Sequence, residues 1–202
     1  YEELTPQVHA LETGLSSDPS MNRRLSALDS FHLISNSDAH SPAKLGREAN
    51  LFDIPMSYDG LYGAIQRGEG LAGTIEFFPE EGKYHFDGHR KCHLCLSPSQ
   101  ARQYNGICPV CGKKLTTGVL HRIEQLADRQ EDFILPGGRP YENLVPLPEV
   151  IAACMGSSSA SVKVTRQYEH MLEELGNEFH ILRSAGLDDI SRIGGQLTAQ
   201  GI

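Results

Sequence analysis

The chain has 202 residues, a formal net charge of -8 and 39% hydrophobic residues, which suits a globular protein with one sizeable core or two small ones. The acidic balance argues against a protein that coats DNA by charge alone. No run of eighteen apolar residues is present, so we expect no membrane span. The chain opens at Tyr1 with neither a basic nor an apolar leader, and four of its five cysteines fall in close pairs, so we expect a protein of the reducing cytoplasm.

Short strands and a helix alternate at the start of the chain. Residues 8–11 and 31–35 are apolar runs typical of buried strands, and residues 20–30 carry apolar side chains at helical spacing. Each run leads to an acidic residue and a loop, with Glu12 after the first and Asp38 after the second. Barrels of alternating strands and helices build their active sites at strand ends of this kind.

The second of these loops carries candidate metal ligands. Asp38 and His40 stand two residues apart, so in an extended segment their side chains point the same way. A carboxylate and an imidazole can then bind one Zn, Mn or Fe ion in a hydrolytic site. The alternative for this loop is a helix N-cap beside a solvated histidine, and Glu12 could equally cap its own loop.

A mixed aromatic and basic segment follows the next predicted helix and strand. Apolar side chains at helical spacing end at residues 67–70, and residues 71–78 are strand-like. Residues 76–91 then alternate aromatic side chains with His, Lys and Arg. Aromatic faces stack on bases and cations bind phosphate. This pattern is equally typical of a nucleic-acid contact and of a hairpin that covers the core of the following element. The candidate contact residues are Tyr84, His85, His89 and Arg90.

Two Cys-x-x-Cys pairs predict a structural zinc site. Cys92 and Cys95 are separated by twelve residues from Cys108 and Cys111. Each pair can place two thiolates on one turn, and two turns complete a tetrahedral shell in a zinc ribbon. A closed four-thiolate shell has no open position for chemistry, so we expect a scaffold here rather than a catalytic site. The alternatives are two disulfides, or His93 as a substitute ligand.

The rest of the chain is predicted to be largely helical. Residues 118–129 have one apolar helix face, and residues 130–148 form a Pro/Gly-rich connection, where we place a domain boundary. Helices are expected over 146–155 and over a segment with apolar residues from Val164 to Leu175.

The order of these segments resembles a known family. Residues 12–19 (Glu-Thr-Gly-Leu-Ser-Ser-Asp-Pro) and 35–42 (Ser-Asn-Ser-Asp-Ala-His-Ser-Pro) resemble the closing segments of a PHP (polymerase and histidinol phosphatase) domain. With residues 73–85 and the paired cysteines after them, nearly the whole chain resembles the C-terminal portion of the endonuclease Q family. Members of that family are DNA repair nucleases.

The resemblance implies both a fold and an activity. The α/β fold would hold the C-terminal part of a PHP-type distorted (β/α) barrel (residues 1–75), a four-cysteine zinc ribbon (76–130) and a helical C-terminal region (131–202). The activity would be metal-dependent hydrolysis of the DNA backbone 5′ of deaminated bases (uracil, hypoxanthine or xanthine) and of abasic sites. Asp38 and His40 match the family's final metal ligands, for Zn, Mn or Mg, and Glu12 matches a strand-end acid near them.

One departure from the family pattern bears on activity. The family's opening His-x-His and its middle ligands are absent from these residues. We therefore expect the chain not to be catalytic alone. Two alternatives stay open: a non-catalytic zinc-ribbon adaptor that binds nucleic acid or protein, and a PHP phosphoesterase acting on small phosphate esters.

Overall fold

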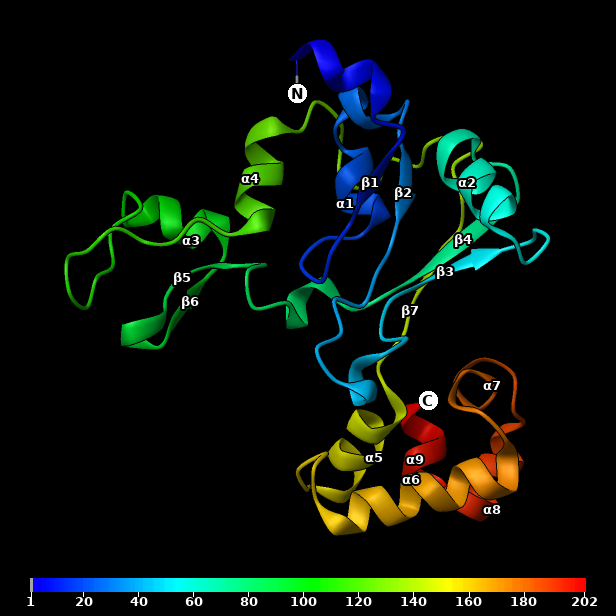
Figure 1. Cartoon of the computed structure of the whole chain (residues 1–202). Coiled ribbons are helices and arrows are strands. Elements are labelled where there is room, and N and C mark those ends of the chain that lie inside the picture. The colour runs from blue at the N-terminus through cyan, green and yellow to red at the C-terminus, as the bar shows by residue number, and fades with distance from the viewer. Residues whose placement is uncertain (1) are drawn as a thin grey trace. The chain divides into compact units, whose positions relative to one another are not determined.

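The computed structural model describes residues 2–202, and the chain divides into two compact units (Figure 1). The first runs to Asn143 and the second is Leu144–Ile202. The division lies inside the Pro/Gly-rich connection of residues 130–148. Among the described residues, no helix is long and apolar enough to cross a membrane.

The first unit starts with a short 3-10 helix, η1 (Glu2–Gln7), and a β-α-β element. The strands β1 (Ala10–Glu12) and β2 (His32–Ile34) are parallel, with Leu11 opposite Leu33. Between them, α1 (Pro19–Arg23) begins where the Asp18 carboxylate accepts from the Met21 N–H at 2.8 Å. The single helix expected over residues 20–30 is interrupted, because Leu25 is extended before η2 (Ser26–Leu28).

A second sheet has the order β3-β4-β7. The strand β3 (Ala49–Phe52) is antiparallel to β4 (Leu71–Glu76), and β7 (Tyr141–Asn143) is parallel to β4. The 3-10 helix η3 (Pro42–Lys44) precedes β3. Helix α2 (Tyr58–Arg67) joins β3 to β4 and ends at Gly68, whose φ of 72° suits a residue without Cβ.

The β-strands form small, separate sheets. Within residues 2–202 the strands form sheets of two, three and two strands. The strands β1, β2 and β4 that the family resemblance assigns to a PHP-type barrel are present, and their closure into such a barrel stays a prediction.

The paired cysteines lie in the segment between η4 (Pro79–Glu81) and α4 (Val119–Leu126), which contains the β5–β6 hairpin and is called the cysteine hairpin below. The antiparallel strands are β5 (Asp87–His89) and β6 (Leu94–Leu96), joined through η5 (Arg90–Cys92) and followed by α3 (Pro98–Gln103). This part has its own small core of buried residues: Leu96, Ala101, Cys108 and Leu115.

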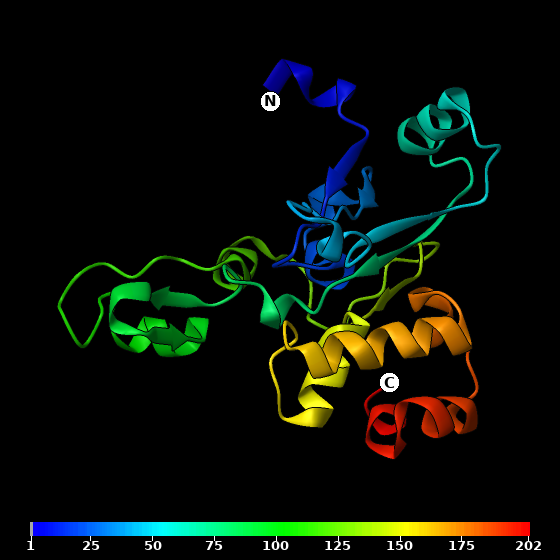
Figure 2. The ribbon, with the colours of Figure 1, turned by 60° about the horizontal axis from the view of Figure 1, so that its bottom comes forward.

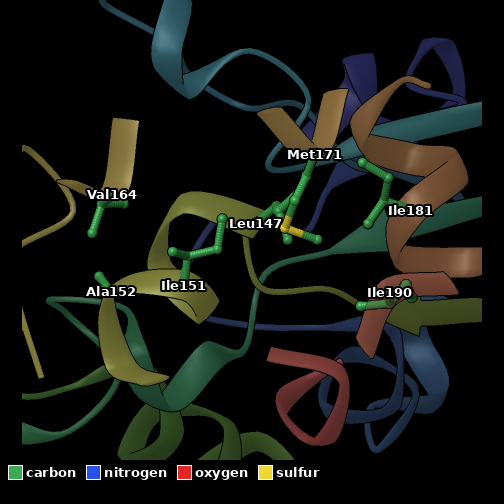
Figure 3. Packing of buried hydrophobic residues seen from close by; sticks show 7 residues of the cluster. All are labelled: Leu147, Ile151, Ala152, Val164, Met171, Ile181 and Ile190. Carbon is green, nitrogen blue, oxygen red and sulfur yellow. The ribbon is translucent and has the colours of Figure 1, made fainter. Parts of the chain in front are cut away.

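The second unit is entirely helical: α5 (Leu147–Met155), α6 (Val162–Leu175), α7 (Glu178–Arg183), α8 (Leu187–Gly194) and α9 (Gln196–Gly201). Helix α6 packs against α5, α7 and α8 (Figure 2). Its Val164 and Met171 are fully buried among side chains from the neighbouring helices (Figure 3). The predicted apolar face of α6 is confirmed, because Val164 belongs to this core and Tyr168, Leu172 and Leu175 pack against it; Met171 was not among the predicted residues.

Candidate functional site

The loop after β2 presents Asp38 and His40 at the surface. Both side chains are exposed, and Asp38 has a φ of 45°, the left-handed conformation that a non-glycine residue rarely adopts. The segment is therefore not extended at Asp38, so the expectation that strand-like alternation points the two side chains the same way was wrong. The Nδ1–H of His40 donates to the backbone carbonyl of Asp38 at 2.9 Å, since a carbonyl can only accept. In the neutral ring this leaves Nε2 unprotonated and free to bind a cation. Arg47 holds the loop by donating to the Ser37 carbonyl at 2.8 Å.

Glu12 lies at the end of β1, paired in register with Ile34, and its side chain is exposed. Among residues 2–202 it joins neither Asp38 nor His40 in a group of three close metal-binding side chains. The strands therefore bring the three candidates to the same ends of β1 and β2, and a metal shell at this place would need further ligands. Their roles as ligands stay predictions.

A buried polar network below these strand ends was not predicted from the sequence. Glu76, at the end of β4, is fully buried and its carboxylate accepts from Thr13 at 2.8 Å, from Ser35 at 3.1 Å and from Thr74 at 2.5 Å. These hydroxyls come from the residues that follow β1 and β2 and from β4 itself. Glu76 thus ties the carboxyl ends of three strands together. Burial raises the pKa of this carboxyl above its ordinary value.

A second buried acid lies across the sheet from Glu76. The strands β3 and β4 are antiparallel and Ala49 is the register partner of Ile75. Glu48, just before β3, therefore lies opposite Glu76, the last residue of β4. Glu48 is 3% exposed, and its Oε2 has no hydrogen-bond partner among the described residues. Burial and the neighbouring Glu76 raise the pKa of Glu48 to about 7. The only sequence signal for either acid was the position of Glu76 at the end of an apolar strand.

The cysteine hairpin forms the strongest candidate metal site. Its ligand atoms, the thiols of Cys92, Cys108 and Cys111 with one imidazole nitrogen of His89, all lie within 4.8 Å of one another. Nδ1 of His89 is 3.4 Å from Sγ of Cys111. Three thiolates and one imidazole are an ordinary ligand set for tetrahedral Zn²⁺. All five cysteines are free thiols, so the alternative of two disulfides does not hold in this structure.

The structure differs from the expected four-cysteine set at Cys95, which is exposed and lies outside the cluster. Side chains alternate between the two faces of a strand. Leu94 and Leu96 of β6 point to the small core that contains Cys108, so Cys95 between them points away. His89 is the register partner of Leu94 and therefore lies on the core face, where its imidazole is the fourth member of the candidate cluster. His93, the other alternative, is exposed and also lies outside the cluster.

The four residues expected to contact DNA have different environments. Tyr84 is 60% exposed and Arg90 is exposed, so both can reach a ligand. His85 is only 3% exposed; its Nδ1–H donates to the Ser16 carbonyl at 3.1 Å, and its ring packs edge-on against Phe86. Direct DNA contact therefore does not suit His85, because its polar edge is already bonded inside the fold. His89, as described above, faces the thiols.

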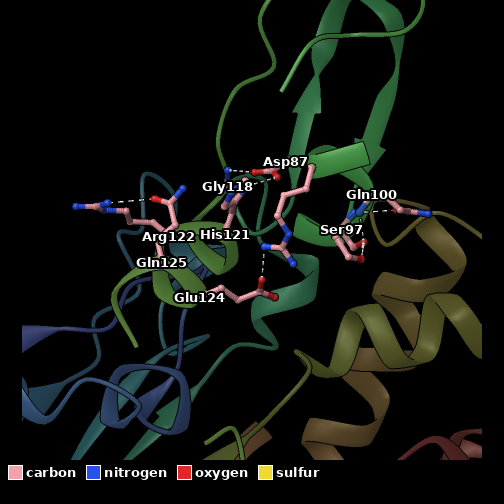
Figure 4. Close-up of polar contacts among 10 residues, drawn as sticks. Asp87, Ser97, Gln100, Gly118, His121, Arg122, Glu124 and Gln125 are labelled. Carbon is pink, nitrogen blue, oxygen red and sulfur yellow. Dashed lines mark hydrogen bonds and ion pairs between the residues drawn. The ribbon is translucent and has the colours of Figure 1, made fainter. Parts of the chain in front are cut away.

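A buried aspartate fixes the hairpin to α4 (Figure 4). Asp87, 1% exposed, accepts from the Gly118 N–H at 2.6 Å and from His121 at 2.5 Å. Arg102 of α3 also donates to Glu124 of α4 at 2.9 Å. The candidate metal cluster is thus held on a helix whose C-terminal flank also contacts η2, between β1 and β2, because Asp128 just after α4 accepts from the Ser26 N–H at 2.9 Å.

Comparisons with known proteins give matches over most of the chain. The family model described as "MJ0043 C-terminal domain" matches residues 146–202. Uncharacterized protein MJ0043 of Methanocaldococcus jannaschii is 34% identical over 202 residues, which are 96% of this chain and 25% of that protein. Uncharacterized protein YqxK of Bacillus subtilis is 28% identical over 190 residues, 92% of this chain and 45% of that protein. The chain thus spans less than half the length of these curated relatives.

Two solved structures are similar across 96% of this chain and 49% of theirs. One is the lesion-specific endonuclease PfuEndoQ of Pyrococcus furiosus, with a TM-score of 0.83 and 31% identity. The other is Endonuclease Q in complex with a 27-mer duplex substrate that has an abasic lesion at the active site, with a TM-score of 0.85 and 30% identity. The resemblance predicted from the sequence is confirmed: the chain resembles the endonuclease Q family and corresponds to about half of the solved chains, as a C-terminal portion would.

Proposed function

We propose that this chain is part of a metal-dependent DNA endonuclease that cuts the phosphodiester backbone 5′ of deaminated bases and abasic sites. One observation carries the proposal: the chain matches the lesion-specific endonuclease over 96% of its length at 31% identity and a TM-score of 0.83. The related structure with an abasic duplex supports damaged DNA as the substrate class. Because the chain covers 49% of those chains, the remaining ligands and substrate contacts would come from elsewhere in the protein.

Asp38 and His40 would bind the catalytic cation in this proposal. The geometry of the loop fits such a role, since the Asp38 carbonyl fixes Nδ1 of His40 and leaves Nε2 free. Metal-bound histidines commonly donate their second ring nitrogen to a backbone carbonyl in this way. A bound Zn, Mn or Mg ion would activate water and stabilise the leaving oxygen. Glu12, exposed at the end of β1, would add negative charge beside these ligands.

The hairpin would act as a structural metal centre that carries DNA contacts. We propose Zn²⁺ bound by His89, Cys92, Cys108 and Cys111, because this donor set is closed and leaves no position for a substrate. The exposed Tyr84 and Arg90 would then stack on a base and bind a phosphate. An enzyme that reads one damaged base must take that base out of the stack, and an aromatic side chain beside the strand helps to hold it open.

The proposal is tested by replacing Asp38 in the intact protein. Asp38→Ala should abolish nicking of a uracil-containing duplex and leave DNA binding, measured by fluorescence anisotropy, close to the unchanged level. Asp53→Ala is the matched control, since Asp53 is also an exposed aspartate of the first unit. Undiminished nicking by Asp38→Ala would reject the metal role. DNA binding by the unchanged protein without any nicking would instead favour the adaptor.

A further inference from the structure

A large cavity lies in the first unit, apart from the loop of Asp38 and His40. Its volume is about 770 Å³. It is lined by α1, by the residues at the start of β2, and by the segment 133–141 that leads into β7. His32 is the first residue of β2, whereas Asp38 and His40 follow the end of that strand. The cavity is therefore a separate candidate site.

Three basic side chains line this cavity: Arg23, His32 and Arg139. The guanidinium of Arg23 donates to the carbonyls of Leu28 at 2.5 Å and Phe31 at 2.9 Å, which uses two of its five N–H donors. Arg139 donates to the Gly68 carbonyl. A Cβ built on Gly68 would meet both the His32 ring and the Arg139 guanidinium, so these two groups lie close together.

None of these three groups forms an ion pair among the described residues, although the Asp29 carboxylate offsets part of the charge of Arg23. Asp29 is the acidic residue that lines the cavity, and its carboxylate already holds Arg129 in a two-point contact at 2.7 and 2.5 Å. The Arg129 hydrogen bond keeps the pKa of Asp29 below its ordinary value. In a chain with a net charge of -8, the cavity is thus a local concentration of positive charge.

Burial, then Arg139, Arg23 and His9, lowers the pKa of His32, as expected where positive groups crowd one another without an anion. Aromatic side chains complete the lining. Phe31 and Tyr141 are both half-buried at the cavity, and Phe133 stacks on Arg129 at 4.1 Å from the guanidinium carbon to the ring centre. Arginine donors suit phosphate oxygens, and aromatic faces suit a base or sugar.

We propose that this cavity binds the phosphate group of a nucleotide unit, either in a free nucleotide or within a DNA strand. Arg23 and Arg139 would donate to the phosphate oxygens, and His32 would contribute a third donor. Phe31 and Tyr141 would contact the attached nucleoside. The proposal does not rest on the nuclease assignment, because neither Asp38 nor His40 takes part.

The test is calorimetric titration of the purified chain with inorganic phosphate, thymidine 5′-monophosphate, thymidine and a six-nucleotide thymidine strand. We expect saturable binding of the phosphate-bearing ligands and none of thymidine. If the chain binds the mononucleotide and not the strand, the ligand is a free nucleotide. If the chain binds the strand more tightly, the ligand is DNA. Both results support the site. Binding of thymidine as tightly as its monophosphate would overturn it.

Arg139→Gln is the diagnostic variant, because Arg139 is exposed and its loss should leave the fold intact. Loss of one charge-assisted contact should weaken phosphate binding by about tenfold. Arg192→Gln makes the same change in charge on an exposed residue of the second unit and should have no effect. Equal weakening by both variants, or by neither, would contradict the proposal.

An NMR titration of His32 gives a second readout that does not depend on a variant. Bound phosphate should raise the pKa of the His32 ring, because the anion offsets Arg23, Arg139 and His9. Asp38→Ala should leave this rise unchanged, so failure of the nuclease assignment is distinguishable from failure of this site. An unchanged His32 pKa at saturating phosphate would overturn the proposal.

Discussion

Replacing Glu48 by Gln should alter how the stability of the first unit depends on pH. Glu48 is 3% exposed and lies across the β3–β4 pair from Glu76. Burial and Glu76 raise the pKa of Glu48 from 4.5 to about 7. The folded unit therefore binds a proton that the unfolded chain releases between these pH values. The stability that comes from this proton is fully present below pH 4.5 and is lost as the pH rises through about 7.

The size of the effect follows from the same two values. Each pKa unit corresponds to about 1.36 kcal/mol, so the difference between 4.5 and about 7 amounts to about 3 kcal/mol at most. Glutamine is isosteric and stays neutral. The Glu48→Gln variant should therefore gain up to about 3 kcal/mol relative to the unchanged chain between pH 5 and pH 8.5. The stability of the Glu48→Gln variant should still fall as the pH rises, but less steeply than that of the unchanged chain, because burial also raises the pKa of Glu76.

The assay is urea unfolding at several pH values, at a constant saturating zinc concentration, followed by NMR signals of Leu71 and Ile75 in β4. Those residues report on the first unit, which avoids treating two compact units as one transition. Glu131→Gln, a change at an exposed position, is the matched control. Parallel pH curves for the unchanged chain and Glu48→Gln would refute the argument from burial.

Three further predictions concern the candidate metal cluster, the join between the cysteine hairpin and α4, and the core of the helical unit. Cys95→Ser should retain one zinc per chain by elemental analysis whereas Cys108→Ser should lose it, and equal losses would contradict the ligand set with His89. Asp87→Ala should destabilise the join between the hairpin and α4 by about 1–3 kcal/mol, because it leaves the Gly118 N–H and His121 without their acceptor; local hydrogen exchange would measure it, and unaltered exchange near α4 would count against it. Met171→Ala should destabilise the helical unit by about 2–5 kcal/mol, since Met171 is fully buried; urea unfolding followed on α6 signals checks this, and a change below about 1 kcal/mol would show a loosely packed core.

Local patterns in the sequence predicted several elements correctly. The strand-like run 71–78 corresponds to β4, the helix expected over 118–129 to α4, and the apolar spacing from Val164 to Leu175 to α6. Each of these elements is marked by a regular spacing of apolar residues or by a residue that ends the element, all within a few positions of the chain. Strands β3 and β7 were missed: no strand was expected at β3, and β7 lies in the Pro/Gly-rich connection. Both are short, and their pairing with β4 comes from distant parts of the chain.

The candidate sites divide in the same way. Spacing alone identified the cysteine hairpin as a candidate metal site, because each Cys-x-x-Cys pair is local. The exchange of Cys95 for His89 depends on strand register, which sequence spacing does not encode. Glu76 contacts Thr13 and Ser35, which lie 63 and 41 positions away in the chain, so no local pattern indicates this network. The cavity lined by Arg23, His32 and Arg139 is likewise built from segments that are far apart in the sequence.

The most direct test of the central claim is the dependence of DNA cleavage on a lesion. The intact protein would be incubated, with divalent metal, with two end-labelled duplexes that differ only in one abasic site, and the products would be resolved on a denaturing gel. We expect one nick on the 5′ side of the abasic site and an uncut control duplex. Equal cleavage of both duplexes, or no cleavage of either by a folded and metal-loaded protein, would contradict the assignment as a lesion-specific nuclease.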